Sequence, residues 1–372
     1  MRADPDGAVE LSEAIGRESE VDKLWSILPT KNLILSGRWG IGKTTVARLM
    51  IADAPTGWRG CYVPLAEASG AEQLRKCILE SVGRDPEASE TIRAAIGPTL
   101  GEEPPPKADP LTQSAIEHEL DDRNIGVVLA LDDFDLFLAN TLAAGGGAEL
   151  SALLARLATL TGGGTRARLL LVSNTFIDRR LAQLGEGARP LFSACARMQL
   201  AALRPEGGAR LVTSLLLGES ITARDRAALA RALADNCDHV PRWIHCAMAH
   251  FVARGKPILD GDLERCMVEA VSDLERAPWL LRRELAPVLD EYIQPQRGHA
   301  LSILDQLALG EEQAMTFGQI SRQIAMETKI DDDALTRVVG ELCGDQLIEE
   351  LGGQLRFCGE LLRMAWLKLR FM

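Results

Sequence analysis

The residues best suited to chemistry form a glycine-rich segment near the N-terminus. The pattern G-x-x-x-x-G-K-[ST] is matched by Gly37, Arg38, Trp39, Gly40, Ile41, Gly42, Lys43 and Thr44. Glycines at these spacings let backbone N–H groups turn inward around a phosphate, where side chains would block the approach. A lysine neutralises the β- and γ-phosphates, and a threonine hydroxyl is a hard oxygen ligand for Mg²⁺. The segment therefore predicts a phosphate-binding loop.

The elements around this loop fit the same prediction. The apolar residues 32–36 indicate a strand before it, and residues 45–52 indicate a helix after it. The N-terminus of that helix would direct its positive dipole end at the bound phosphate. The alternative is a chance match in a chain with 33 glycines, which the correctly placed strand and helix disfavour.

A second group of polar residues follows another apolar run. Residues 127–131 (VVLAL) lead directly into Asp132, Asp133 and Asp135. Ligands of parallel sheets lie at the carboxyl ends of the strands. We expect Asp132 to hold Mg²⁺, through water, and Asp133 to orient or deprotonate an attacking water. The alternative is a solvated acidic turn. Aspartate is one methylene shorter than the glutamate common at this position, so hydrolysis could be slow or absent.

Three weaker signals complete the candidate site. Asn174, after the apolar run 169–172, could bind the γ-phosphate or the attacking water, or could be a turn or capping residue. Arg242 follows a helix-starting Pro241 and could reach the γ-phosphate, or be an ordinary solvated arginine. Histidines and cysteines cluster at 237–250, but their spacing does not suit zinc, and we expect buried cysteines and surface histidines.

Five short apolar runs alternate with helical patterns across the first half of the chain. They are residues 32–36, 61–65, 127–131, 169–173 and 198–200. Such alternation predicts an α/β fold with a parallel sheet and helices on both faces. Because run 61–65 intervenes, the acidic strand need not lie directly beside the strand that precedes the phosphate loop.

Changes in the predicted secondary structure along the chain indicate four regions. Residues 1–13 are a loose leader, residues 14–203 the α/β core, residues 204–295 a helical domain, and residues 296–372 a third domain. In the last, three helices precede two strands around Gly352–Gly353, the order of a winged helix. The Pro-rich segment 101–110 predicts a surface loop.

Composition narrows the class of protein. The 372 residues carry a net charge of −12, which argues against a chain that mainly coats nucleic acid or an anionic membrane. No apolar run reaches the length of a membrane span, and the N-terminus lacks a signal-peptide pattern. Eight scattered cysteines without a CxxC pair predict a reduced, cytoplasmic protein.

Taken in order, these motifs resemble the AAA+-related initiator-type and STAND ATPases, in their bacterial and archaeal single-chain forms. The quoted segments are 14–28, GRWGIGKTT (37–45), VVLALDDFD (127–135), LLLVSNT (169–175) and VPRW (240–243), with the terminal winged helix. The resemblance implies an α/β P-loop core, an all-helical lid and a C-terminal winged helix.

The same resemblance implies roles for individual residues. The segment ending at Arg17 would lie near adenine, and Gly37 to Thr45 would hold the phosphates of ATP or ADP. Asp132 would coordinate Mg²⁺ with Thr44, and Asp133 would be catalytic. Asn174 and Arg242 would be the two sensors of the nucleotide. The DDFD sequence is nearer to STAND proteins, although their repeat arrays are missing here.

The expected function is an ATP-dependent switch whose nucleotide state controls self-assembly or a protein partner. The alternatives are a DNA-associated initiator or transposition-type ATPase, and a nucleotide-locked scaffold that never turns over. The composition of the winged-helix region argues against DNA binding, because it contains eight Lys and Arg and twelve Asp and Glu, a net charge of −4. Its third helix begins with Asp331 to Asp333, which would repel a phosphate backbone.

Overall fold

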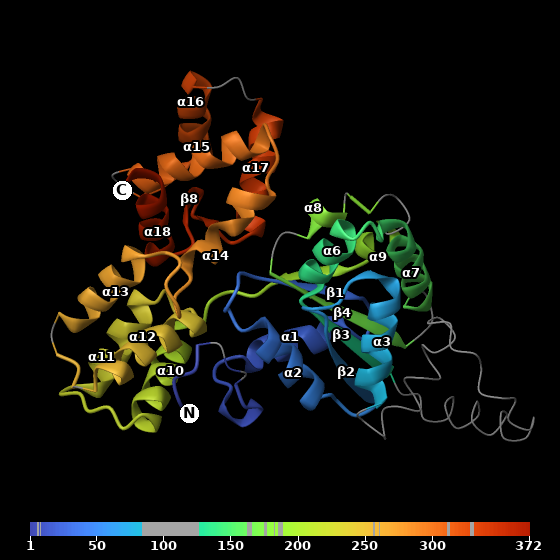
Figure 1. Ribbon diagram of the computed structural model, residues 1–372, viewed down its shortest axis with the longest axis horizontal. Coiled ribbons are helices and arrows are strands. Elements are labelled where there is room, and N and C mark those ends of the chain that lie inside the picture. The colour runs from blue at the N-terminus through green and yellow to red at the C-terminus, as the bar shows by residue number, and fades with distance from the viewer. Residues whose placement is uncertain are drawn as a thin grey trace, which may run out of the picture. The chain divides into compact units, whose positions relative to one another are not determined.

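A computed structural model describes the chain except residues 6, 8, 84–125, 162–165, 175–176, 182, 185–188, 256, 260, 311–312 and 328–330. The predicted loop at 101–110 lies outside the described residues. The chain forms two compact units, each described here by itself. The sheet unit comprises Arg17–Ser36 and Lys43–Leu200, and the helical unit comprises Met1–Gly16, Gly37–Gly42 and Ala201–Met372 (Figure 1).

A five-stranded parallel sheet forms the centre of the sheet unit. Its order is β2-β3-β4-β1-β5. The strands are β1 (Leu33–Ser36), β2 (Trp58–Pro64), β3 (Gly126–Asp132), β4 (Ala167–Ser173) and β5 (Ala196–Gln199). All five predicted strands are present. β4 lies between β3 and β1, so the acidic strand does not lie beside the phosphate-loop strand, an arrangement that the sequence had left open.

Helices surround this sheet, as predicted. They are α1 (Glu18–Ile27), α2 (Lys43–Ala52), α3 (Gly70–Gly83), α6 (Phe134–Ala143), α7 (Gly147–Leu160), α8 (Asp178–Leu181) and α9 (Arg189–Ser193). Successive residues of a strand point to opposite faces, and every residue of β3 is buried. Both faces of the sheet are therefore covered, which is why the strands read as continuous apolar runs.

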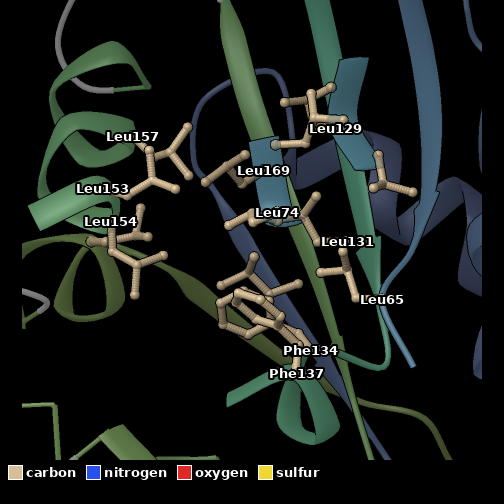
Figure 2. Close-up of a cluster of buried hydrophobic side chains, with 14 of the residues drawn as sticks. Leu65, Leu74, Leu129, Leu131, Phe134, Phe137, Leu153, Leu154, Leu157 and Leu169 are labelled. Carbon is tan, nitrogen blue, oxygen red and sulfur yellow. The ribbon is translucent and has the colours of Figure 1, made fainter. Parts of the chain in front are cut away.

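A hydrophobic core cluster lies on one face of the sheet (Figure 2). Leu129 and Leu131 of β3 and Leu169 of β4 point toward the side chains of α3, α6 and α7. Those side chains include Leu74, Phe134, Phe137, Leu153, Leu154 and Leu157. Each fully buried side chain of this size contributes about 1.5–3 kcal/mol. This packing fixes the strand ends that carry the polar residues.

The helical unit contains a 3₁₀ turn, Leu11–Glu13, and then the helices expected at 204–295. These are α10 (Pro205–Gly218), α11 (Arg226–Asn236), α12 (Pro241–Arg254), α13 (Asp262–Ser272), α14 (Leu281–Ala286) and a π-helical turn, Pro287–Glu291. The helical pattern of the sequence predicts helices over 262–277 and 278–292, and both predictions are wrong in their bounds, because α13 ends at Ser272 and α14 begins at Leu281. Pro278 disfavours helix in the residue before it, and Leu280 has a left-handed φ of 50°.

The C-terminal part of this unit contains α15 (Gln296–Leu309), α16 (Phe317–Glu327), α17 (Asp332–Gly344) and α18 (Glu360–Phe371). Its sheet, β6-β8-β7, is antiparallel, with β6 (Ala314–Thr316), β7 (Ile348–Leu351) and β8 (Gln354–Phe357). The hairpin expected around Gly352 and Gly353 is present, both with positive φ. The three-residue β6 was not predicted, because so short a run carries no periodic signal.

Two ends of the helical unit are tied to its middle. The Asp238 carboxylate accepts the N–H groups of Glu360 and Leu361, so it caps α18. Near the N-terminus, the Ala3 N–H donates to Glu219 at 2.7 Å, and the Asp4 N–H donates to Nδ1 of His245 at 3.1 Å. No described helix has the length and apolarity needed to cross a membrane.

Candidate functional site

The phosphate loop lies between β1 and α2, where the sequence placed it. Gly40 and Gly42 have φ of +74° and +100°, values that residues with a Cβ rarely adopt. Lys43 begins α2 and is buried, whereas the side chain of Thr44 is exposed and that of Thr45 is half-buried. The glycine pattern therefore corresponds to backbone conformations that only glycine adopts readily.

Strand register brings the other candidates to the same edge of the sheet. Ser36 at the end of β1 pairs with Ser173 of β4, and Leu131 of β3 pairs with Leu171. Asp132 and Asn174 follow directly from these strands. The parallel sheet thus places the acidic residues and the predicted sensor at the edge where β1 ends.

Asp132 is buried at the end of β3. Its Oδ2 atom accepts the hydroxyl of Tyr62 at 2.6 Å, and its Oδ1 atom accepts the N–H of Asp133 at 3.0 Å. Tyr62 comes from the neighbouring strand β2, and no sequence pattern predicts a role for it, because contact between side chains of neighbouring strands depends on strand register. Burial raises the pKa of Tyr62, and so does the charge of Asp132. The tyrosine therefore remains a donor that fixes the carboxylate.

Asn174 links the two other aspartates. Its Nδ2 atom donates to Oδ1 of Asp133 at 3.2 Å, and its backbone N–H donates to Oδ1 of Asp135 at 3.1 Å. Asp135 is almost fully buried in the first turn of α6. The sequence patterns predict no role for Asp135. In the structure it positions Asn174, and a signal existed in the D-x-D spacing of Asp133 and Asp135.

The carboxylates are electrostatically coupled. Burial raises the pKa of Asp133, and the charge of Asp132 raises it further, while Asn174 and Lys43 act in the opposite direction. Burial also raises the pKa of Asp135, again opposed by the Asn174 N–H and by Lys43. The Lys43 ammonium is thus near enough to both carboxylates to stabilise their charged forms.

The loop residues 37–42 make their contacts within the helical unit. The Arg38 N–H donates to Oε1 of Gln346 at 2.8 Å, and the Arg38 guanidinium lies 4.5 Å from the ring centroid of Trp243. The Gly40 carbonyl accepts the N–H of Arg242 at 3.2 Å. The loop is therefore held by α12 and by the turn between α17 and β7.

Arg242 lies against this loop, although its guanidinium is turned to the chain itself. Its side chain packs so closely on Gly40 that a Cβ there would approach it to 2.5 Å. Its NH2 group donates to the Pro278 carbonyl at 2.6 Å, and its NH1 group donates to the Pro5 carbonyl. Only 5% of the residue is exposed, so the reading of a solvated arginine is wrong.

Two other sequence predictions can be placed. Arg17 precedes α1, is 3% exposed and donates to Glu20 at 3.2 Å. In the cluster at 237–250, Cys237 and Cys246 are buried as expected, but His245 is buried as well, so the surface prediction is wrong for it. It lies on the inner side of α12, and burial lowers its pKa to about 4.

The residues present suit a triphosphate with magnesium. The left-handed glycines leave the loop amides uncovered by Cβ atoms, and Lys43 supplies the cation. No group of three or more His, Cys, Asp or Glu that could hold a metal ion occurs among the described residues. Magnesium bound to nucleotide needs only one or two protein oxygens, because phosphates and waters supply the rest. Asp132 and Thr44 offer oxygens of the required kind.

Comparison with known proteins agrees with this geometry. Residues 29–181 match the family model described as AAA domain, a stretch that includes the phosphate loop and the acidic strand. No curated protein sequence matches the chain.

Two solved structures resemble the whole chain. The Walker-type ATPase PABY2304 of Pyrococcus abyssi is 15% identical, with a TM-score of 0.65, over 98% of this chain and 99% of that one. The ORC2 protein of Aeropyrum pernix, in its ADPNP–ADP complexes, is 18% identical, with a TM-score of 0.54, over 98% and 95%. At these identities the likeness concerns the fold alone. The chain has a P-loop, AAA+-like α/β core within a fold shared along its length with a Walker-type ATPase.

Proposed function

We propose that the chain is an ATP-binding and ATP-hydrolysing molecular switch of the STAND and AAA+ kind. One observation carries the proposal. At one edge of the sheet, Asp132 and the hydrogen-bonded pair of Asp133 and Asn174 lie where Lys43 exerts its charge. Nucleotide hydrolysis requires a cation that binds phosphate, a carboxylate that can bind a metal ion, and a base that is held in position. Lys43, Asp132 and Asp133 are suited to these three roles, and Asn174 holds Asp133.

Each residue has a role in this proposal. Lys43 neutralises the phosphates, which are cradled by the amides of 37–45. Asp133 takes the proton of the attacking water, and Asn174 orients both partners. Thr44 and Asp132 would hold Mg²⁺, which, when bound, supplies positive charge to the phosphate oxygens. Arg17 borders the adenine.

We further propose that the helices α10–α14 are a lid and that residues 296–372 are a winged helix. The support is the order of elements and the hold of the helical unit on the loop. Arg38 and Gly40 bond to Gln346 and Arg242, so phosphates entering the loop would compete with contacts to both parts. For Arg242 to act as a sensor, it must exchange the carbonyls of Pro5 and Pro278 for a phosphate. The resulting rearrangement would expose a surface for self-assembly or for a protein partner.

Substitution of Lys43 tests the proposal. Removing this ammonium by Lys43→Ala leaves phosphate charge uncompensated, so we expect ATP and ADP binding to fall at least about 100-fold, as for the loss of a charge-assisted contact. The exposed Lys23→Ala on α1 is the control for charge alone. Calorimetric titration with each nucleotide gives the affinities. Unchanged affinity in Lys43→Ala would refute the site.

Measurement of phosphate release tests whether the chain hydrolyses ATP. Steady release above background supports hydrolysis. Release at background level, with nucleotide co-purifying, selects the scaffold that holds nucleotide without turnover.

A further inference from the structure

Trp39 of the phosphate loop contacts two arginines of the helical unit. The guanidinium carbon of Arg242, on α12, lies 3.7 Å from the centroid of the Trp39 ring, and that of Arg283, on α14, lies 4.4 Å from it. Both distances are within cation–π range. Two cations are therefore placed on a residue four positions before Lys43.

The two arginines differ in what their N–H groups contact. Arg242 is buried, and its terminal nitrogens donate to the carbonyls of Pro278 and Pro5. Arg283 is exposed, and no described carboxylate lies within ion-pair distance of it. The adjacent Arg282, by contrast, pairs with Glu275 at 3.4 Å. Of these two arginines, Arg283 is the one whose donors are available at the loop, and no sequence pattern predicted a role for it.

The contact with Trp39 leaves the chemistry of Arg283 intact. A cation–π contact uses the positive charge of a guanidinium and does not consume its N–H donors. Those donors match two oxygens of a phosphate at once. Contact with Trp39 also restricts the side chain beforehand, which lowers the entropy lost on binding.

We propose that Arg283 binds the terminal phosphate of ATP and so makes the loop discriminate between ATP and ADP. The inference rests on the proposed function, because it assumes that the loop holds a nucleotide. A guanidinium without a carboxylate partner gains most from the ligand with the largest negative charge, and the terminal phosphate is the group that ADP lacks. Trp39 acts as the platform that presents Arg283.

The test compares affinities for a non-hydrolysable ATP analogue and for ADP in matched variants. In Arg283→Ala, we expect affinity for the analogue to fall about 10- to 100-fold, the range for a charge-assisted contact, and ADP affinity to change less than about threefold. Arg283→Gln, which keeps a polar side chain but is shorter and uncharged, should lose affinity for the analogue in the same way, and Arg283→Lys should recover part of the loss. Arg282→Ala, on the same helix, is the control and should leave both affinities unchanged.

The outcomes distinguish failure of the proposed role of Arg283 from failure of the proposed function. Equal loss for both nucleotides in Arg283→Ala, or a response no larger than in Arg282→Ala, would overturn the role of Arg283 while leaving nucleotide binding established. Unfolding of both the alanine and the glutamine variants would also contradict it, since an exposed phosphate-binding side chain is not needed for stability. If the wild-type chain binds neither nucleotide, the proposed function itself fails.

Discussion

Asp133 has both an unusual backbone conformation and a shifted side-chain pKa. Its φ of 54° lies in the left-handed region, which costs a residue with a side chain on the order of 1–3 kcal/mol, although aspartate and asparagine tolerate it best. Burial and Asp132 oppose its ionisation, and Asn174 supports it. Backbone strain at a carboxylate whose charged form is stabilised by an amide is consistent with the proposed catalytic role of Asp133.

Asp133→Asn isolates the proton-accepting role, because asparagine retains both the shape and the tolerance of left-handed backbone. We expect turnover of ATP to fall about 10²- to 10⁴-fold, the usual contribution of a general base, while ATP affinity stays within about threefold. Phosphate release and nucleotide titration measure the two effects. The control is Asp178→Asn, at an exposed aspartate paired with Arg197. Turnover equal to that of the control would remove Asp133 from the mechanism.

His245 predicts a pH dependence of stability. Burial lowers its pKa from 6.5 to about 4, and the Asp4 N–H occupies its Nδ1 atom. Between these values the unfolded chain binds the proton and the folded chain does not, so stability is lost as the pH falls from 6.5 toward 4. The corresponding loss in free energy of unfolding from pH 7 to pH 5 is about 2 kcal/mol.

Urea unfolding of the wild type and His245→Gln at pH 7 and pH 5 measures this contribution. The variant should lose less stability than the wild type between the two values, by about the 2 kcal/mol that linkage assigns to the histidine. An identical pH dependence in both proteins would show that His245 does not carry the effect.

At the scale of elements, the conformation of the phosphate loop is set partly by its own glycines and partly by α12. Gly40 needs its positive φ, and a Cβ there would also meet the side chain of Arg242 at 2.5 Å. Gly70, at the start of α3, has a similar φ of +77° but open space around the position of a Cβ. The two glycines share a backbone requirement and differ in steric surroundings.

Gly40→Ala and Gly70→Ala separate these effects. Both pay roughly 1–2 kcal/mol for a left-handed residue with a side chain. Only Gly40→Ala must also displace Arg242, so it should unfold at a lower temperature than Gly70→Ala and lose ATP affinity. Thermal unfolding and nucleotide titration of both variants give the comparison. Equal unfolding temperatures with ATP binding retained in both would mean that the contact of α12 with the loop is unimportant.

The acidic start of α17 has a structural explanation. The Asp331 carboxylate accepts the N–H of Ala334 at 2.6 Å and caps the helix, and Asp332 accepts the hydroxyl of Ser321 at 3.2 Å. Negative side chains also complement the positive end of a helix dipole. These carboxylates serve the helix, and they leave it poorly suited to approach a phosphate backbone.

At the scale of the whole molecule, net charge argues against a nucleic-acid partner. The chain carries −12, and Arg356 of β8, the arginine of the predicted wing, is paired with Glu349 at 2.7 Å. We expect no retention on duplex DNA at physiological salt, because a net charge of −12 repels the phosphate backbone of DNA. Retention measured as a function of salt tests this. Binding at physiological salt that weakens steeply above it would favour the DNA-associated alternative.

Sequence patterns predicted more about elements than about contacts. Local sequence signals predicted the five strands, the glycine loop and the hairpin at Gly352. These signals are apolar runs, the spacing of glycines and a pair of turn residues. The helix predicted over 262–277 ends instead at Ser272, because apolar periodicity indicates that a helix exists but specifies its end poorly. Tyr62, Asp135 and Arg283 were missed because their importance comes from neighbours distant in sequence.

The sequence by itself determined which chemistry is present at the loop and at the acidic strand. Glycine spacing, a lysine and a carboxylate after a buried strand are local properties, dictated by backbone sterics and hydrophobic burial. Only the tertiary structure decided how these groups are held. The register of β3 against β4 pairs Asn174 with Asp133, and the packing of α12 and α14 on Trp39 engages one arginine while leaving another available. Such choices depend on packing and on which donors are already satisfied, and no local pattern encodes them.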